Sequence, residues 1–208
     1  MKFLDLTREI SESSPVYPGD PPVLLTSEAE WERDGIRLRN LSFSSHQGTH
    51  IDAPAHVLES GAFLNAFPLE VFSGPARVLK LGKVRPRTAL TREMLETFEE
   101  IFRECPRILF SASWEGRQFE DAPFFTPEAA LWLTRQEHIL LLGFDWASPD
   151  AFEDEDLPIH RILLAERLLF IENLTNLEKL PDEFRLTAFP ISFDQADGAP
   201  VRAVAEFE

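Results

Sequence analysis

Six side chains in this sequence have the types and spacing of metal ligands and of a proton-transfer group. Three of the five histidines and one aspartate fall within eleven positions, and a further histidine lies twelve residues before a glutamate. The six residues are His46, His50, Asp52, His56, His160 and Glu172. Imidazole and carboxylate ligands together suit zinc, manganese or iron(II), whereas calcium prefers a larger set of oxygens. The pattern therefore indicates a metal centre.

The early cluster needs a bend if it is to hold one ion. His50 and Asp52 are two positions apart, so their side chains leave the same face of an extended segment. A helix is disfavoured because a glycine, two β-branched residues and a proline occupy this segment. A fully extended chain would separate the α-carbons of His46 and His50 by roughly 13 Å, too far for ligand bonds of about 2 Å. We therefore expect a bend at Gly48, where glycine makes it least costly.

A second ion would need ligands from further along the chain. His160 and Glu172 could supply them, with the Asp52 carboxylate bridging the two ions. The alternative is that all six are ordinary polar residues in loops, which is the usual role of a lone histidine. Because four of the five histidines join one pattern, the metal centre is the better interpretation.

The segments around these residues are expected to present them at the ends of strands and helices. Residues 31–44 alternate weakly and should form a strand that leads into the histidine cluster. Residues 158–167 should form a helix with His160 in its first turn, and residues 168–171 a strand that ends at Glu172. Strand ends commonly present functional side chains in α/β folds.

The remaining segments indicate the fold class. Strands are expected over residues 3–7, 76–84, 107–111, 138–145, 184–193 and 201–207, the last two joined through Asp197-Gly198. Helices are expected from the capping residue Thr91 to about residue 104 and from Thr126-Pro127 onward. Strands alternating with about three helices, without a linker or repeat, predict one α/β domain spanning residues 1–208.

Composition narrows the class of protein and its partners. The chain has 208 residues and 44% apolar content, enough for a sizeable core. A formal net charge of −16 argues against binding to nucleic acid or to an anionic membrane. The single Cys105 excludes an intramolecular disulfide, and the N-terminal residues lack the apolar run of a signal peptide. We therefore expect a soluble, cytoplasmic protein.

Two turn-rich segments are candidates for the walls of a binding pocket. Residues 11–22 contain Tyr17-Pro18-Gly19-Asp20, and Pro-Gly suits the centre of a type II turn, so this is a rigid corner. Residues 114–125 combine aromatic and charged side chains and form either a pocket wall or a packed surface loop. His138 and Cys105 are expected to have structural roles.

These motifs resemble the metal-dependent cyclase and bacterial-type kynurenine formamidase family. The segment His46-Gln-Gly-Thr-His50-Ile-Asp52-Ala-Pro-Ala-His56 fits the family pattern H-x-G-T-H-x-D-x-P-x-H at every fixed position. The similarity covers nearly the whole chain, through Tyr17-Pro-Gly-Asp20, Leu157-Pro-Ile-His160, Ile171-Glu-Asn-Leu174 and Asp197-Gly-Ala-Pro-Val-Arg202.

The resemblance implies a swivelling β/β/α fold with a mixed sheet and about three to four helices, assembled as a homodimer or a larger homo-oligomer. It implies two divalent metal ions, usually zinc, with manganese as the alternative. By matching positions, one ion would be held by His46, His50 and Asp52, the other by Asp52, His160 and Glu172, and His56 would be left as the acid/base. The implied reaction is hydrolysis of N-formyl-L-kynurenine to L-kynurenine and formate in tryptophan catabolism.

Two positions depart from the family pattern. Formamidases of the family typically carry tryptophan before the Pro-Gly-Asp turn, where it contacts the aromatic substrate. Here the residue is Tyr17, which can still stack on an aromatic ring, though with less area. Trp146 stands where a smaller residue is expected and would reshape the pocket.

Two alternatives therefore remain beside the formamidase. One is a metal-dependent hydrolase of another small or cyclic amide, such as isatin, or of an ester. The other is a metal- or ligand-binding protein without catalysis. An unliganded His56 argues against the second alternative, because a purely structural zinc site is normally closed by four protein ligands.

Overall fold

A nine-stranded mixed sheet forms the centre of the molecule in a computed structural model, which describes residues 1–115 and 118–208. The strand order is β1-β13-β11-β5-β7-β9-β10-β4-β12. These strands are β1 (Lys2–Asp5), β4 (His50–Asp52), β5 (Ser73–Lys83), β7 (Arg107–Ser113), β9 (Leu141–Phe144), β10 (Leu169–Glu172), β11 (Glu183–Thr187), β12 (Gly198–Pro200) and β13 (Val204–Phe207). The expected α/β class with a mixed sheet is confirmed.

The middle of the sheet is parallel and buried. Strands β5, β7, β9 and β10 run parallel to one another, and every residue of β9 and β10 is buried. Near-continuous apolar runs of this kind are typical of parallel strands with both faces covered. The strand expected over residues 138–145 therefore exists, but it starts only at Leu141, and His138 is exposed before it.

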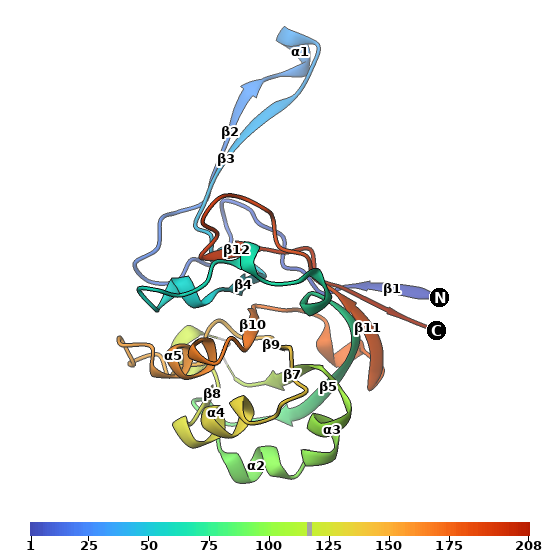
Figure 1. Cartoon of the computed structure of the whole chain (residues 1–208). Coiled ribbons are helices and arrows are strands. Elements are labelled where there is room, and N and C mark those ends of the chain that lie inside the picture. The colour runs from blue at the N-terminus through green and yellow to red at the C-terminus, as the bar shows by residue number, and fades with distance from the viewer. Residues whose placement is uncertain (116–117) are drawn as a thin grey trace.

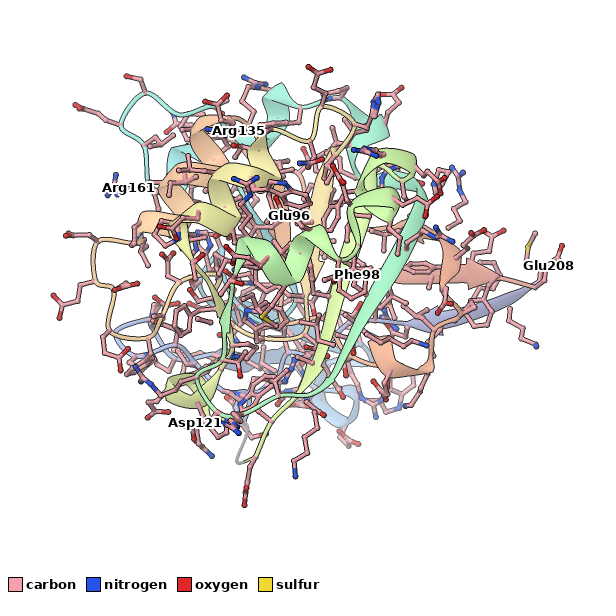
Figure 2. All side chains as sticks on the ribbon, turned by 90° about the horizontal axis from the view of Figure 1, so that it is seen from below. Glu96, Phe98, Asp121, Arg135, Arg161 and Glu208 are labelled. Carbon is pink, nitrogen blue, oxygen red and sulfur yellow. The ribbon has the colours of Figure 1, made fainter. Side chains whose placement is uncertain are left out.

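Four helices lie together on one side of the sheet, at the bottom and left of Figure 1. They are α2 (Arg92–Glu96), α3 (Glu99–Glu104), α4 (Pro127–Thr134) and α5 (Pro158–Ala165). Figure 2 looks onto this helical side from below, with Glu96, Phe98 and Arg135 on the elements nearest the viewer. The single helix expected after Thr91 is interrupted at Phe98, whose backbone φ of −112° and ψ of 15° leave the helical region.

A two-stranded arm projects from the opposite end of the molecule (Figure 1). It consists of β2 (Leu24–Ala29), the short helix α1 (Trp31–Asp34) and β3 (Leu38–Ser42), and β2 pairs with β3 in a sheet of its own. The expectation of one strand over residues 31–44 was therefore wrong in part. Gly35, with φ of 69°, ends the helical turn at the tip of the arm and returns the chain into β3.

The C-terminal strands also differ from expectation. The strand expected over residues 184–193 ends at Thr187, and the segment that follows contains Pro190, which has no N–H to donate to a sheet. Residues 198–200 form the separate strand β12, which pairs with β4 and not with its sequence neighbours β11 and β13. This return brings Asp197 to the edge of the histidine cluster.

The loop expected over residues 114–125 includes residues 116 and 117, which lie outside the described residues. Its remainder contains a 3-10 turn, Phe119–Asp121, and the two-residue strand β8 (Phe124–Phe125), which pairs with β6 (Ala89–Leu90). Among residues 1–115 and 118–208, the helices are all too short or too polar to cross a lipid bilayer.

The first turn of α4 offers a test of the local structure. The Thr126 hydroxyl accepts a hydrogen bond from the Ala129 backbone N–H at 3.2 Å, so Thr126→Ala should lower the free energy of unfolding by about 1 kcal/mol. Thr126→Ser keeps the acceptor and is the matched control. Urea denaturation measures both variants, and equal destabilisation by alanine and serine would contradict the capping role.

Candidate metal centre

The pairing of β4 with β10 brings the two distant segments of the site together. His50 lies opposite Glu172 in this antiparallel pair, and Asp52 lies opposite Phe170. Residues directly opposite in antiparallel strands have α-carbons about 4.5–5.5 Å apart, so His50 and Glu172 are neighbours. Both side chains, and that of Asp52, are buried.

Two glycines bring His46 back to this strand. Gly48 has φ of 67°, a conformation that favours glycine, so the chain bends there as expected from the sequence. Gly198 lies opposite Asp52 in β12, and a Cβ built on it would lie 2.4 Å from Cε1 of His46. The imidazole of His46 therefore packs directly on the backbone of β12, which only glycine at position 198 permits.

The nitrogen and oxygen atoms of the cluster face one another across a small space. His46 Nδ1 lies 2.8 Å and His50 Nε2 lies 3.2 Å from Asp52 Oδ1. His160 Nε2 lies 3.2 Å from Asp52 Oδ2, so imidazoles approach both oxygens of this carboxylate. Glu172 completes the cluster, with Oε2 3.4 Å from His50 Nε2 and Oε1 3.5 Å from His160 Nε2.

Groups outside this cluster hold the opposite nitrogen of each ring. His50 Nδ1 donates to the Gly48 carbonyl oxygen at 3.0 Å, and His160 Nδ1 lies 2.5 Å from Asp150 Oδ2. His46 Nε2 lies 3.3 Å from Asp197 Oδ2. Such contacts fix the orientation of a ligating imidazole and raise its basicity. All three histidines are thus arranged to present one nitrogen to the cluster.

Asp150 and Asp197 are parts of the site that the sequence interpretation missed. Asp150 also accepts hydrogen bonds from the backbone N–H groups of Ile159 at 2.5 Å and His160 at 3.1 Å, so it caps α5 from outside that helix. Leu157, at the N-cap position, has a side chain that cannot accept a hydrogen bond. The sequence therefore indicates only that the first turn of α5 needs an acceptor from elsewhere in the chain. For Asp197, the Asp-Gly pair predicts only a turn.

The electrostatics of the cluster favour positive charge. Burial opposes a charge on His46, but the Asp52 and Asp197 carboxylates outweigh it and raise the pKa of His46 to about 10. Burial is likewise outweighed at His160, where Asp150, Asp52 and Glu172 hold the pKa well above its ordinary value. Because a metal ligand must be a neutral imidazole, a cation that binds here must displace these protons.

The two central carboxylates respond to this environment in opposite ways. Burial would raise the pKa of Asp52, but the imidazoles of His46, His160 and His50 outweigh it and hold that pKa well below its usual range. Burial, together with the neighbouring Asp52 carboxylate, raises the pKa of Glu172. Two carboxylates this close in a protein interior repel each other unless a cation lies between them.

The donor set fits divalent metal ions. Within the described part of the chain, Asp52 Oδ2 and Glu172 Oε1 are fully buried and lack a partner with hydrogen-bond geometry. Orphaned buried oxygens are costly, and they are the atoms that a cation would satisfy. Among residues 1–115 and 118–208, two groups of side chains have ligand atoms within 4.8 Å of one another: one consists of His46, Asp52 and His56, and the other of Asp52, His160 and Glu172.

His56 stands beside the cluster on the 3-10 turn Pro54–His56. Its ring centroid lies 3.9 Å from that of His46 and 5.8 Å from that of His160. Burial lowers the pKa of His56 to about 4, so the ring is neutral near pH 7 and can accept a proton. The geometry leaves His56 near enough to be a ligand or a proton acceptor.

A cavity of about 430 Å³ opens onto the cluster. This volume suits a small organic ligand. Aromatic side chains form much of its wall, namely Tyr17, Trp114, Phe119 and Trp146. Trp114 and Phe119 belong to the segment over residues 114–125, for which the sequence left open a pocket wall or a packed surface loop. The described residues of this segment form part of the pocket wall.

Tyr17 and Trp146 differ in how firmly they are held. Tyr17 is half-buried, with ring centroids 5.5 Å from Phe119 and 6.1 Å from Phe152. Trp146 is buried and stacks on Phe144 at 4.8 Å and 23°. Tyr17 is therefore the more exposed of these two aromatic side chains of the wall.

Comparisons with known proteins show which family the chain belongs to. Residues 4–151 match the Cyclase family model. A kynurenine formamidase from Salinibacter ruber is 32% identical, and the alignment covers 98% of this chain and 97% of that protein. A solved structure described as a predicted metal-dependent hydrolase from Bacillus stearothermophilus is 27% identical with a TM-score of 0.77, covering 98% of this chain and 97% of that one.

A further solved structure supports the fold alone. Isatin hydrolase A from Labrenzia aggregata, bound to benzyl benzoate, has a TM-score of 0.84 at 23% identity. The alignment covers 98% of this chain and 93% of the solved chain.

The contact between Asp150 and His160 offers a test of metal binding that needs no substrate. Asp150→Asn removes the charge that orients and polarises His160, so the affinity for zinc should fall about 10–100-fold. Asp156→Asn, an exposed acid near the start of α5, is the matched control and should bind zinc like the wild type. Competition with a chromophoric chelator measures the affinity. Unchanged affinity in Asp150→Asn, with the fold intact, would contradict the assignment.

Proposed function

Because the chain belongs to the Cyclase family and is a hydrolase that acts on a non-peptide carbon–nitrogen bond, we propose that it hydrolyses N-formyl-L-kynurenine to L-kynurenine and formate in tryptophan catabolism. One observation carries the proposal. Two buried carboxylates and three oriented imidazoles meet beside a cavity with aromatic walls, in a chain 32% identical to a kynurenine formamidase along nearly its whole length.

The proposed site would hold two ions, and the two ligand sets share one residue, Asp52. His46, His50 and Asp52 would hold one, and Asp52, His160 and Glu172 would hold the other, with zinc as the metal and manganese as the alternative. When bound, the ions would lower the pKa of a water molecule and stabilise negative charge on a carbonyl oxygen. The approach of imidazoles to both Asp52 oxygens supports a bridging role for that carboxylate.

His56 is the proton-transfer group in the proposed reaction. Its neutral imidazole takes the proton of the attacking water and passes it to the nitrogen of the leaving aromatic amine. Burial lowers the pKa of His56 to about 4, so its imidazole is neutral near pH 7 and has a nitrogen that can accept a proton. The position of His56 beside the His46 and His160 rings, at the edge of the cavity, supports this role.

The aromatic wall accounts for the proposed substrate class. Tyr17, together with Phe119 and Trp114, offers ring faces to an aniline ring, and such contacts contribute about 0.5–1.5 kcal/mol beyond the buried area. Tyr17 also favours a second candidate, a small cyclic aromatic amide such as isatin, because the tyrosine ring leaves more room beside the cluster than a tryptophan would. The chemistry at the cluster is the same for both.

The cellular setting forms part of the proposal. We propose a cytoplasmic enzyme, since the single cysteine is reduced and buried in the core. The family resemblance further implies a homodimer or a higher homo-oligomer.

Removal of His56 tests the proton-transfer role. His56→Ala should lower kcat about 10²–10⁴-fold on N-formyl-L-kynurenine while the protein keeps its metal. His138→Ala removes an exposed histidine outside the cavity and is the control, with unchanged kcat. The assay combines absorbance of the released kynurenine with metal analysis. Near-normal turnover in fully metallated His56→Ala would rule out the role.

Removal of Asp52 tests the bridging role. Asp52→Ala should lose both ions, whereas His46→Ala should lose only the ion that it ligates. Elemental analysis after dialysis against a buffer of defined zinc concentration measures the stoichiometry. Equal metal content in the wild type and Asp52→Ala would contradict a bridging carboxylate.

The identity of the substrate can be tested at Tyr17. If formylkynurenine is the substrate, the wild type should show a kcat/KM for it at least tenfold above that for isatin, and Tyr17→Trp should retain this preference. Steady-state kinetics on both compounds, with metal content matched, decides the question. A higher kcat/KM for isatin would favour the cyclic amide.

A further inference from the structure

The ring of Tyr17, in the wall of the cavity, contacts aromatic side chains from two other loops. Its ring centroid lies 5.5 Å from that of Phe119 and 6.1 Å from that of Phe152. Phe119 begins the 3-10 turn Phe119–Asp121, and Phe152 belongs to the acidic loop over residues 151–157. Tilted aromatic pairs at such distances attract one another. We refer to these three residues as the ring cluster, and it joins three segments that are far apart in the sequence.

Arg87 contacts both of the loops that supply the two phenylalanines. Its guanidinium group forms a two-pronged ion pair with Glu153, in which Nη2 donates to Oε2 at 2.8 Å and Nη1 donates to Oε1. Nη1 also donates to the Glu120 carbonyl oxygen at 3.4 Å, and the Arg87 backbone N–H donates to the Asp121 carbonyl oxygen at 2.9 Å. Each of these partners lies within two positions of a phenylalanine of the ring cluster. One side chain thus connects the two loops behind Tyr17.

The backbone of Arg87 has an uncommon conformation. Its φ of 59° lies in the left-handed region, which residues other than glycine, asparagine and aspartate adopt infrequently. Arg87 follows Pro86 in the turn between β5 and β6, and glycine or asparagine would fit the same backbone at a lower cost. A costly conformation persists where the surrounding contacts determine it. The contacts of the Arg87 side chain with the two loops supply such a reason.

We propose that Arg87 is a positioning residue for the aromatic wall of the cavity. It holds the loops of Phe119 and Phe152 together, so that both rings pack on Tyr17 and set its place for an aromatic substrate. The described lining of the cavity does not include Arg87, so the residue acts through the ring cluster and not by touching the substrate. The inference rests on the proposed function for the substrate, but not for the arrangement of the loops.

The exposure of the ion pair sets the size of the expected effect. The side chains of Arg87 and Glu153 are 47% and 56% exposed. Exposed ion pairs contribute little because water and salt screen them, and two-pronged geometry places this pair at the upper end of that range. Loss of the pair should therefore weaken substrate binding about two- to fivefold without abolishing activity. A wall that binds the substrate and its transition state equally affects KM and leaves kcat unchanged.

Steady-state kinetics of the metal-loaded enzyme on N-formyl-L-kynurenine tests the positioning role. Arg87→Asn keeps a residue suited to the left-handed backbone, so the turn should fold, but its side chain is too short for the ion pair. This variant should raise KM about two- to fivefold and leave kcat within about twofold. Arg87→Lys keeps the charge without the planar fork and should have an intermediate KM. Arg92→Ala is the matched control, because it removes a similarly exposed ion pair with Glu96 on α2, and Figure 2 shows Glu96 well apart from Asp121.

The partner of Arg87 separates the ion pair from a general effect of charge. Glu153→Gln should raise KM as much as Arg87→Asn does, and the double variant should be no worse than either single one, because all three lack the same pair. In about 1 M sodium chloride the Debye length falls to about 3 Å, so the wild-type KM should approach that of Arg87→Asn in the same salt. Additive effects of the two substitutions, or a fall in kcat with KM unchanged, would overturn the proposal.

Amide hydrogen exchange measures the loops without any substrate. The Asp20 N–H donates to the Tyr17 carbonyl oxygen at 3.0 Å, and the Ala122 N–H donates to the Phe119 carbonyl oxygen at 3.2 Å. Both amides should exchange about two- to fivefold faster in Arg87→Asn, while the amides of the buried strand β9 keep their wild-type rates. Unchanged exchange at both loop amides would overturn the positioning role even in an active formamidase. Faster exchange in a metal-loaded protein that hydrolyses neither formylkynurenine nor isatin would support that role and overturn the proposed function alone.

Discussion

The proximity of two buried carboxylates is the constraint on which the rest of this structure depends. Asp52 and Glu172 are both nearly inaccessible to solvent, and the same imidazoles contact both of them. Removing one carboxylate from water costs several kcal/mol, and placing a second beside it adds repulsion. Imidazolium groups or metal ions can offset this cost, so the cluster is built to hold positive charge. A cluster of neutral residues would have been easier to bury.

The fold meets this constraint by using backbone pairing to set the positions of the ligands. β4 lies between β10 and β12, so its two neighbours present Glu172 on one side and Gly198 on the other. Thr49 adds a side-chain link, since its hydroxyl donates to the Asn173 carbonyl oxygen at 2.7 Å. Arg8 donates to the same carbonyl at 3.1 Å and to the Asp145 carbonyl at 3.0 Å. The two ligand segments are therefore held by strand pairing and by side-chain hydrogen bonds to backbone carbonyls, none of which depends on the metal.

The sequence allowed the centre of the site to be predicted, because chemistry there requires rare residue types at short spacing. The bend at Gly48, the placement of His160 in the first turn of α5 and the position of Glu172 at a strand end all follow from local rules. Asp150 could not be found in this way. It is one of 36 acidic residues, and its partner lies ten positions away across a loop.

The same reasoning explains the errors in the fold. The strand over residues 138–145 was expected because it is an apolar run, and the strand over residues 76–84 because apolar and polar residues alternate there. The arm was missed because its strands alternate only weakly. The strand β12 is three residues long and owes its existence to pairing with β4, a contact of long range that no local pattern shows. Phe98 packs against the core at the point where the predicted helix is interrupted, and helix propensity alone does not reveal this break.

The central claim is that this chain places cations between the two segments and leaves His56 free of them. Diffraction from crystals of the zinc-loaded protein, recorded on both sides of the zinc absorption edge, tests it most directly. The account predicts two anomalous peaks, one bounded by His46, His50 and Asp52 and the other by Asp52, His160 and Glu172. A peak ligated by His56, a single peak, or peaks away from Asp52 would contradict it.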